Sequence, residues 1–143
     1  HPSASLAPPP AVRLRACGGP CARRPAPVRR LSVAGCVAAG GTDSAAGPYP
    51  PLWVLYHFIT RDTISGGVLG ADQKITRQEA LRVETINNAY LTFEERIKGS
   101  IEPGKLADLV VLPEDILTCP EKNIERMRVS MTMVGGTIVN RRP

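Results

Sequence analysis

The sequence predicts an α/β fold, in which helices precede a small set of C-terminal strands. Three observations support this prediction. Residues 27–40 can form two helical turns, which are followed by a glycine and a short apolar run. This order is typical of a helix followed by a buried strand. Residues 52–61 and 76–90 repeat apolar side chains at helical spacing. Residues 106–140 contain short β-branched runs separated by turns with Gly or Pro.

The composition limits the kinds of protein that the chain can be. A length of 143 residues is enough for one domain with a hydrophobic core. No apolar run approaches the roughly 18 residues of a membrane span, so we expect no membrane contact. Cys17, Cys21, Cys36 and Cys119 are spaced neither as a zinc finger nor as a disulfide framework, and we expect the last two to be buried. A reduced, cytoplasmic protein is therefore predicted.

Residues 1–26 are rich in Pro, Ala and Arg and poor in large apolar side chains, so we expect a disordered tail. The net charge of +5 comes from the arginines within residues 1–30, which contain no acid. The remaining residues are close to neutral. Such a tail is compatible with binding to nucleic acid or an acidic surface, and also with targeting, although its prolines oppose an amphipathic targeting helix.

The first predicted unit begins at Pro27, which suits the first turn of a helix, and Gly35 ends that helix. The apolar residues 36–40 follow as a predicted buried strand, and Gly41-Thr42-Asp43-Ser44 comes directly after it. In a parallel α/β barrel the catalytic groups lie at the carboxyl ends of the strands, so a carboxylate here suits a metal site. Taken alone, this motif is more typical of a loop whose aspartate caps a turn.

Residues 52–61 form the next predicted helix, with Leu52, Leu55, Tyr56 and Ile59 facing the core. Another side of this helix carries Trp53 and His57. His57 is better explained by packing or surface exposure than by metal binding. Arg61 closes the helix, where a positive charge is favourable. The loop 62–75 is glycine-containing and is predicted to border a pocket.

Thr76 and Glu79 have the spacing of a capping box, so we predict a helix from this point to about Tyr90. Its apolar face indicates packing, and we assign it no chemistry.

A turn at Pro103-Gly104 precedes the apolar run 106–112, which predicts a strand buried on both faces. The only charge in this run is Asp108. Because a carboxylate in a buried strand needs a partner, we expect it to accept hydrogen bonds from backbone N–H groups of the preceding turn.

The last part of the chain predicts a helical turn and a hairpin. Residues 120–127 can form the helical turn. Residues 129–134 and 137–140 form the predicted hairpin, with Gly135-Gly136 as its turn. The alternation of Val129, Met131 and Met133 marks one buried face.

The stretch from Gly99 to Leu112 resembles, without a gap, the Gly-Ser-hydrophobic-Glu-Pro-Gly-Lys-x-Ala-Asp-hydrophobic-Val-Val-Leu signature of metal-dependent amidohydrolases, family 3 in particular. The helix from Thr76 to Ala89 is also similar to a helix of that family, although Glu84 and Asn88 stand where smaller or apolar residues are common. In this family the signature follows a catalytic TIM barrel, where the chain rejoins a small β-sandwich. Since a whole TIM barrel needs about 250 residues, the resemblance implies a C-terminal fragment.

The resemblance implies three parts of the chain. Residues 1–26 are the disordered tail, for which we favour an origin foreign to the family, because the resemblance stops there. Residues 27–98 are the C-terminal part of the barrel and contain its last β/α unit. Residues 99–143 supply the strands of the β-sandwich and the terminal hairpin.

The resemblance also implies a chemistry. Asp43 stands where the family has the aspartate of the last barrel strand, so Asp43 is the candidate metal ligand and catalytic acid–base residue. A divalent metal, which we expect to be zinc, activates the water that hydrolyses a non-peptide C–N bond of a small-molecule amide. The family's other ligands, including a His-x-His on the first strand, are absent from this sequence, and His1 and His57 cannot replace them. We therefore expect the chain alone to be inactive.

A second interpretation stays open, in which the chain is a non-catalytic α+β interaction module with a basic, nucleic-acid-binding tail. We favour the hydrolase fragment and expect no nucleic-acid partner, because the tail lacks the aromatic side chains on which single-stranded nucleic acid stacks. One β/α unit without neighbouring strands exposes apolar faces, so we also expect poor stability or aggregation of the isolated chain. A monomer with a sharp cooperative unfolding transition would contradict that expectation.

Overall fold

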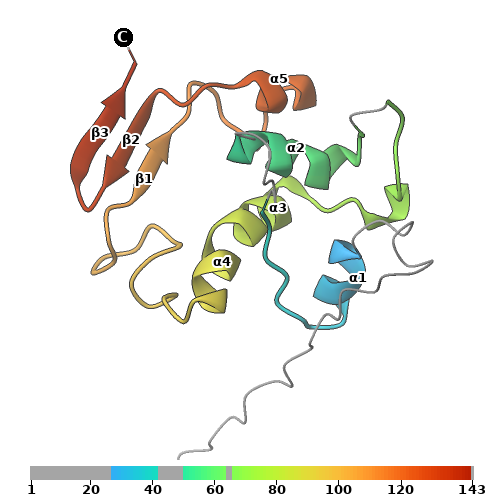
Figure 1. The fold of residues 1–143 in the computed structure, drawn as a ribbon, viewed down its shortest axis with the longest axis horizontal. Coiled ribbons are helices and arrows are strands. Elements are labelled where there is room, and N and C mark those ends of the chain that lie inside the picture. Colours follow the sequence, from blue (N-terminus) through green and yellow to red (C-terminus); the bar gives the residue numbers. More distant parts are fainter. Residues whose placement is uncertain (1–26, 42–49, 64–65, 143) are drawn as a thin grey trace, which may run out of the picture.

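The computed structural model describes residues 27–41, 50–63 and 66–142, and Figure 1 shows their arrangement. The helices lie together, and the strands form a sheet at the opposite end of the molecule. This arrangement confirms an α/β architecture with a small antiparallel sheet. In chain order the elements are α1 (Val28–Val33), α2 (Pro51–Thr60), the 3₁₀ helix η2 (Ala71–Gln73), α3 (Arg77–Glu84), α4 (Ile86–Leu91), β1 (Leu109–Val111), α5 (Glu121–Arg126), β2 (Met131–Val134) and β3 (Thr137–Arg141).

Of the helix–strand unit predicted over residues 27–40, only the helix α1 forms. Gly35 ends α1 as expected, in a left-handed conformation with φ of 76°. Residues 36–40 form irregular backbone instead of the predicted strand, and that prediction is wrong. A strand is defined by the ladder that it forms with a neighbour, and no neighbouring strand lies beside this segment in the described part of the chain. Cys36 is accordingly only half-buried, whereas Cys119 is buried as expected.

Helix α2 is close to the prediction. Pro51 opens the helix, where its fixed φ suits the first turn. Arg61 ends it in a left-handed conformation with φ of 61°, and the Arg61 N–H donates to the His57 carbonyl oxygen over 2.9 Å. Leu55, Tyr56 and Ile59 are buried, as the helical spacing predicts.

The hydrophobic core forms where α2 packs against α3 and α5. Ile124 of α5 and Ala80 of α3 are both 0% exposed, and Leu55 of α2 lies in the same cluster. Ile116 and Cys119, which precede α5, complete this side of the core. The core therefore contains residues from both sides of the predicted domain boundary at residue 98. The boundary itself stays a prediction.

The helix predicted over residues 76–90 begins as expected but is divided in two. The Glu79 N–H donates to the Thr76 hydroxyl over 3.2 Å, and the Thr76 N–H donates to the Glu79 carboxylate over 2.7 Å, which confirms the capping box. The Thr76 N–H, and after it the Thr76 hydroxyl, donate to the Glu79 carboxylate and hold the pKa of Glu79 below its usual value. Thr85, with φ of −124° and ψ of −91°, separates α3 from α4. Its hydroxyl donates to the Leu81 carbonyl oxygen over 2.6 Å, a contact that often bends helices.

Strands β1, β2 and β3 form an antiparallel sheet in chain order. Met133 of β2 pairs with Leu109 of β1 and with Ile138 of β3. The predicted hairpin is confirmed, and Gly135 and Gly136 supply its turn with φ of 55° and 83°.

The sheet is exposed, contrary to the prediction. Strand β1 is shorter than the apolar run 106–112, and its Val110 is 55% exposed. Ile138 and Val139 of β3 are exposed as well, and Met131 of β2 is only half-buried. The prediction that β1 is buried on both faces is wrong, because the described residues supply no second layer to cover the sheet.

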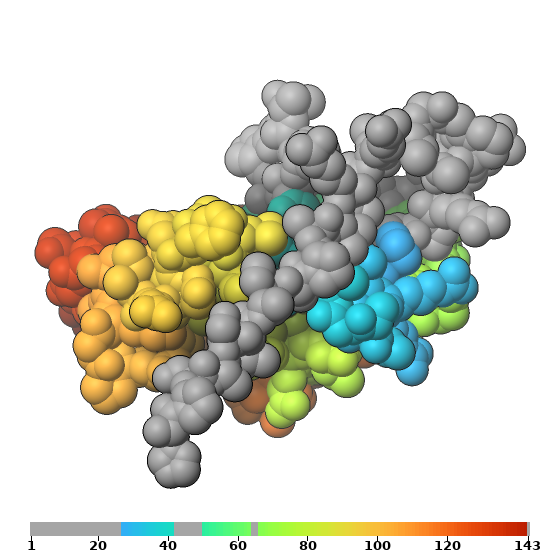
Figure 2. Space-filling model, turned by 90° about the horizontal axis from the view of Figure 1, so that it is seen from below, coloured from blue at the N-terminus to red at the C-terminus, as the bar shows by residue number. Residues whose placement is uncertain are grey.

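A second exposed apolar surface follows α4. Leu91, Phe93 and Ile101 are all exposed, and Phe93 is exposed to 90%. The yellow and orange surface of Figure 2 contains this part of the chain. Exposed apolar area of this kind supports the expectation that the isolated chain aggregates.

Replacing Thr76 by Ala should lower the free energy of unfolding by about 1 kcal/mol, because the capping box loses the hydroxyl that accepts from Glu79 N–H. Urea unfolding followed by the fluorescence of Trp53, the only tryptophan, measures the change. Gln78→Ala, at an exposed position of the same helix, is the matched control and should leave stability nearly unchanged. Equal effects of the two substitutions would contradict a capping role for Thr76.

Candidate functional site

The predicted catalytic residue, Asp43, lies outside the described residues, so its position stays a prediction. The described backbone leads toward it through Gly40 and Gly41. Within the ranges that the structure describes, no three His, Cys, Asp or Glu side chains are grouped so that they could hold a metal ion. The described residues therefore do not fit a metal by themselves, and Asp43 remains the one candidate ligand that the sequence indicates.

The segment leading to Asp43 is held against α3 at very close range. The Gly40 N–H donates to the Val83 carbonyl oxygen over 3.2 Å. A Cβ atom added at Gly40 would lie 2.1 Å from Glu84 Oε1, 2.7 Å from the Phe58 ring and 2.9 Å from a Val83 methyl group. Position 40 therefore requires glycine because a neighbouring helix occupies the space of a side chain.

A side-chain bond holds the same segment against α4. The Asn87 side-chain amide donates to the Ala38 carbonyl oxygen over 2.6 Å. The two contacts, at Ala38 and at Gly40, replace part of the strand pairing that the segment lacks. They fix the direction in which the chain approaches residue 43.

Glu84 is a functional candidate that the sequence pattern did not indicate. Its Oε1 atom is buried and has no hydrogen-bond partner, and it faces Gly40. Burial alone raises the pKa of this carboxyl group. The only signal in the sequence was an acid at a position where the family commonly has a smaller or apolar residue, and that signal did not suggest burial.

His57 packs between two aromatic rings on α2. The centroid of its ring is 3.8 Å from that of Trp53 and 5.2 Å from that of Tyr56. Its Nδ1 lies 2.6 Å from the Asp62 carbonyl oxygen. Because a carbonyl oxygen only accepts, Nδ1 carries the hydrogen and donates it. These contacts agree with the prediction that His57 has a packing role.

Asp62 also interacts with Tyr56. The Tyr56 hydroxyl donates to Asp62 Oδ2 over 2.5 Å. This hydrogen bond to the carboxylate, and then burial, raise the pKa of Tyr56. The Asp62 main chain and side chain thereby fix the orientation of two neighbouring rings of α2.

A pocket of about 420 Å³ lies beside these rings, and we call it the Trp53 pocket. Four residues of loop 62–75 border this pocket, while the predicted role of the loop in shaping a substrate pocket stays a prediction. The residues that line the Trp53 pocket come from α2, from the loop that follows α2, and from α5. They are Trp53, Tyr56, His57, Asp62, Thr63, Gly66, Gly67 and Glu125.

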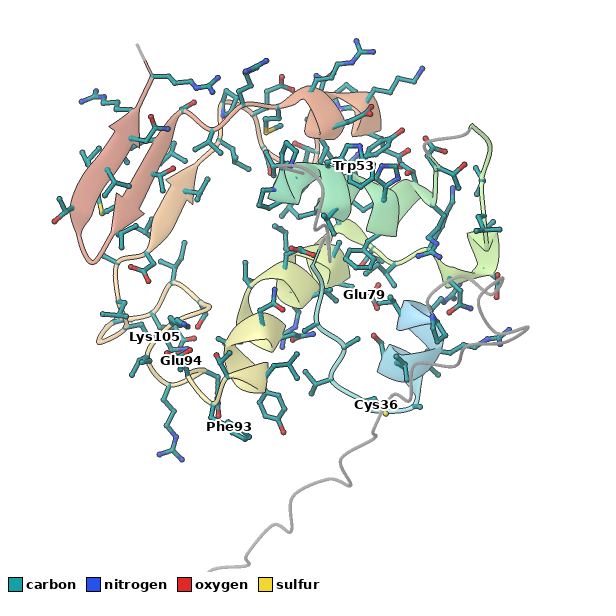
Figure 3. The ribbon with its side chains drawn as sticks, viewed as in Figure 1. Cys36, Trp53, Glu79, Phe93, Glu94 and Lys105 are labelled. Atoms are coloured by element: carbon teal, nitrogen blue, oxygen red, sulfur yellow. The ribbon has the colours of Figure 1, made fainter. Side chains whose placement is uncertain are left out.

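The polar residues of the signature stretch bind one another. The Lys105 ammonium group donates to the Ser100 hydroxyl over 2.5 Å and lies 3.2 Å from Glu102 Oε1. Ser100 in turn donates to Glu102, and this bond, followed by Lys105, lowers the pKa of Glu102. Lys105 and Glu94, labelled in Figure 3, lie in the connection between α4 and the sheet. The signature therefore builds a turn, and its polar side chains are used in holding that turn.

Gly99 and Asp108 fix the two ends of this turn. A Cβ atom at Gly99 would lie 2.8 Å from Ala89 and 2.9 Å from Ile86, so the turn packs closely on α4. Asp108 Oδ1 accepts from the Gly135 N–H over 2.7 Å. The prediction that Asp108 binds the turn before it is wrong, because its partner is the hairpin turn between β2 and β3, far along the chain.

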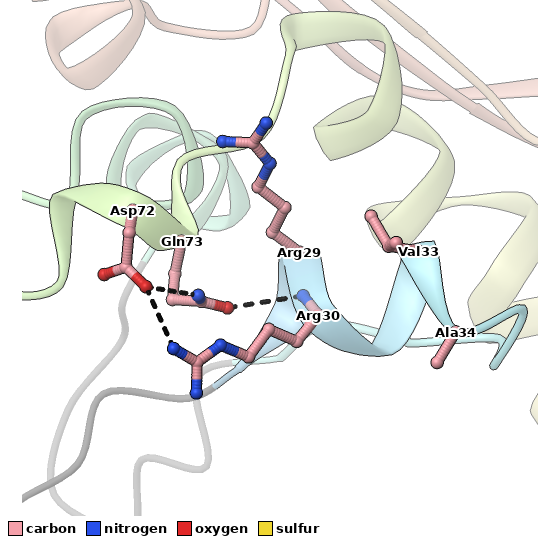
Figure 4. A pocket seen from close by; sticks show the side chains of 6 residues that line it. All are labelled: Arg29, Arg30, Val33, Ala34, Asp72 and Gln73. Carbon is pink, nitrogen blue, oxygen red and sulfur yellow. Dashed lines mark hydrogen bonds and ion pairs between the residues drawn. The ribbon is translucent and has the colours of Figure 1, made fainter.

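A smaller hollow, of about 340 Å³, lies between α1 and η2 (Figure 4). The buried Gln73 accepts from the Arg30 N–H over 3.3 Å and donates to Asp72 Oδ2 over 2.7 Å. The Gln73 bond is the main cause that lowers the pKa of Asp72, while the exposed Arg30 guanidinium lies 3.5 Å from the same oxygen. Exposed ion pairs contribute little, so these contacts serve mainly to join α1 to η2.

Three features indicate a chain of the amidohydrolase class. They are the signature turn, the capped helix before it and the terminal hairpin. Comparison with family models agrees: the model of the Amidohydrolase family, family 3, matches residues 4–140, and this chain belongs to that family. The matched range begins within residues 1–26, and the origin of that segment stays a prediction.

Three curated relatives match most of this chain but only a fraction of their own length. An N-substituted formamide deformylase from Arthrobacter pascens is 35% identical over 112 residues, which are 78% of this chain and 21% of that protein. An imidazolonepropionase from Porphyromonas gingivalis is 32% identical over 114 residues, 80% of this chain and 25% of that protein. The putative amidohydrolase YtcJ from Bacillus subtilis (strain 168) is 25% identical over 114 residues, which are 78% of this chain and 22% of that protein. The chain thus spans about a fifth to a quarter of the length of these relatives.

Among solved structures, an amidohydrolase from Thermotoga maritima MSB8 matches 50% of this chain and 17% of its own, with 31% identity and a TM-score of 0.42.

In the described ranges, none of the helices is both long and apolar enough to cross a membrane.

Replacing Gly40 by Ala should lower the free energy of unfolding by about 1–3 kcal/mol, because the added methyl group must displace Val83, Phe58 and Glu84. Gly41→Ala is the matched control, since a Cβ atom there has no neighbour within 4 Å. Urea unfolding of the two variants measures the difference. Equal stability of both variants would show that α3 does not hold this segment.

Raising the pH should lower the free energy of unfolding of the wild type, and Glu84→Gln should make this decrease smaller. Because the pKa of Glu84 is raised in the folded chain, the stabilisation from its proton is complete below the unfolded pKa of about 4.3 and is lost as the pH rises through the folded value. Urea unfolding between about pH 4 and about pH 8 should therefore show a decrease that is smaller in Glu84→Gln. Glu121→Gln, at an exposed position, should behave as the wild type. Parallel curves for wild type and Glu84→Gln would contradict the buried state of this acid.

Proposed function

We propose that this chain is the C-terminal fragment of a metal-dependent amidohydrolase that hydrolyses a non-peptide C–N bond of a small-molecule amide. The observation that supports this most directly is the family match over residues 4–140, together with the signature turn. Two relatives are named as an N-substituted formamide deformylase and an imidazolonepropionase, and both names refer to small molecules.

The proposed fragment consists of the last β/α unit of a TIM-type barrel and strands of a small β-sandwich. The unpaired segment 36–40 and the uncovered sheet support this proposal, because both lack a neighbouring layer in the described part of the chain. The chain also spans only about a fifth of the deformylase, which leaves ample length for the remaining strands.

In this proposal Asp43 acts at the carboxyl end of the segment that α3 and α4 hold. A divalent metal, zinc in our proposal, supplies an activated water when the complete enzyme binds it. Asp43 would be one of the residues that hold the metal, and its carboxylate would take a proton from a water and return it to the leaving nitrogen. Gly40, three residues before Asp43, lets the backbone pass close to α3, which supports a glycine requirement in this part of the proposed site. One carboxylate binds metal weakly, so the chain alone is inactive.

The proposed enzyme is cytoplasmic and has no membrane or nucleic-acid partner. Cys36 and Cys119 are free thiols, which suits a reducing compartment.

A chimaera tests the function. Residues 27–143 replace the matching segment of the Arthrobacter pascens deformylase, and hydrolysis of an N-substituted formamide is measured together with metal content. Asp43→Asn should lower kcat by about 10²–10⁴-fold and reduce the bound metal, because the proton acceptor and one ligand are lost. Ser44→Ala is the matched control and should retain both properties.

Two results would contradict the proposal. The first is an Asp43→Asn chimaera with unchanged kcat and metal content. The second is an inactive chimaera combined with salt-sensitive nucleic-acid binding by the original chain that disappears when residues 1–26 are removed, which would favour the interaction module.

A further inference from the structure

The Trp53 pocket has no part in the proposed hydrolysis, yet its lining has a consistent chemistry. Three aromatic rings, from Trp53, Tyr56 and His57, line it together with two carboxylates, from Asp62 and Glu125. No Lys or Arg is among its lining residues. Figure 3 labels Trp53 at the place where α2 and α5 lie side by side. The pocket thus combines π-electron faces with negative charge.

The polar atoms of the pocket are mainly hydrogen-bond acceptors. His57 Nδ1 donates to the Asp62 carbonyl oxygen, so Nε2 is the accepting nitrogen of the neutral ring. Nε2 is buried and has no hydrogen-bond partner. Asp62 uses Oδ2 for the Tyr56 hydroxyl, and its negative charge is not balanced by any basic residue of the lining. A positively charged ligand that donates N–H groups would complement the Asp62 carboxylate, which no basic residue of the lining balances.

Glu125 adds a second charge from another element. It lies on α5, is exposed, and forms no ion pair with a described residue. The packing of α5 on α2 brings this carboxylate to the same pocket as the rings. Aromatic rings beside carboxylates attract organic cations, since the ring face is the negative part of its quadrupole.

A metal ion fits these residues less well. The described part of the chain groups no three His, Cys, Asp or Glu side chains at a spacing that could hold a metal. The rings of Trp53 and Tyr56 offer apolar contact, which a bare divalent cation does not use. An alkyl chain on a charged nitrogen uses both the rings and the carboxylates.

We propose that the Trp53 pocket binds a small primary alkylammonium ion. The charged nitrogen lies toward Asp62 and Glu125, and the alkyl chain packs on Trp53. The proposal rests on neither Asp43 nor the proposed hydrolysis.

The test uses the complete chain and n-butylammonium chloride as the probe. Trp53 is the only tryptophan, so its fluorescence reports directly on the pocket. We expect a saturable change with n-butylammonium and binding more than about tenfold weaker for butan-1-ol, which has the same alkyl chain without the charge. Sodium chloride at equal ionic strength corrects for the added salt. Equal responses to the amine and the alcohol would overturn the proposal.

Variants of the carboxylates provide the second part of the test. Glu125→Gln should weaken binding about fivefold, the factor expected for one partly exposed charge pair. Glu121→Gln removes the same charge from an exposed position of the same helix, outside the lining, and should bind as the wild type. Asp62→Asn should also weaken binding, with circular dichroism showing that the chain is folded. Unchanged affinity in both Glu125→Gln and folded Asp62→Asn would overturn the proposal.

Discussion

Burial of Ile124 against α2 is the contact on which most of this structure depends. The C-terminal stretch contributes no strand to the helical part, so the two are joined by side-chain packing of α5, Ile116 and Cys119 on Leu55 and its neighbours. Each such side chain contributes about 1.5–3 kcal/mol when buried. The same packing determines where the signature turn and the sheet are attached, and it brings Glu125 beside Trp53. Loss of this contact would remove the core and the Trp53 pocket together.

A second constraint acts on the segment that leads to the predicted catalytic residue. Without a neighbouring strand, residues 36–40 are held by two contacts, the Gly40 N–H to Val83 and the Asn87 amide to Ala38. The close approach at Gly40 also places the buried Glu84 carboxyl group against the backbone. In a complete barrel, neighbouring strands would add a hydrogen-bonded ladder on both sides of this segment. The helices alone therefore give the approach to residue 43 its direction, and they do so with few bonds.

The signature that places the chain in its family has a structural role here. Ser100, Glu102 and Lys105 bind one another, and Gly99 packs on α4. This stretch links α4 to the sheet, and its polar side chains are occupied in that link. A sequence motif can thus identify an enzyme family through a turn with a structural role, while the chemistry that we propose depends on Asp43, elsewhere in the sequence.

The sequence by itself determined the local features: the capping box at Thr76, the buried face of α2, the glycine turn of the terminal hairpin, and the family. Each of these depends on side chains within a few residues of one another, so their pattern is enough to predict them. Only the tertiary structure decided the partner of Asp108, the break at Thr85, the exposure of β1 and the pocket between α2 and α5. The physical reason is that these features depend on residues distant along the chain, or on a covering layer, and neither has a local pattern in the sequence.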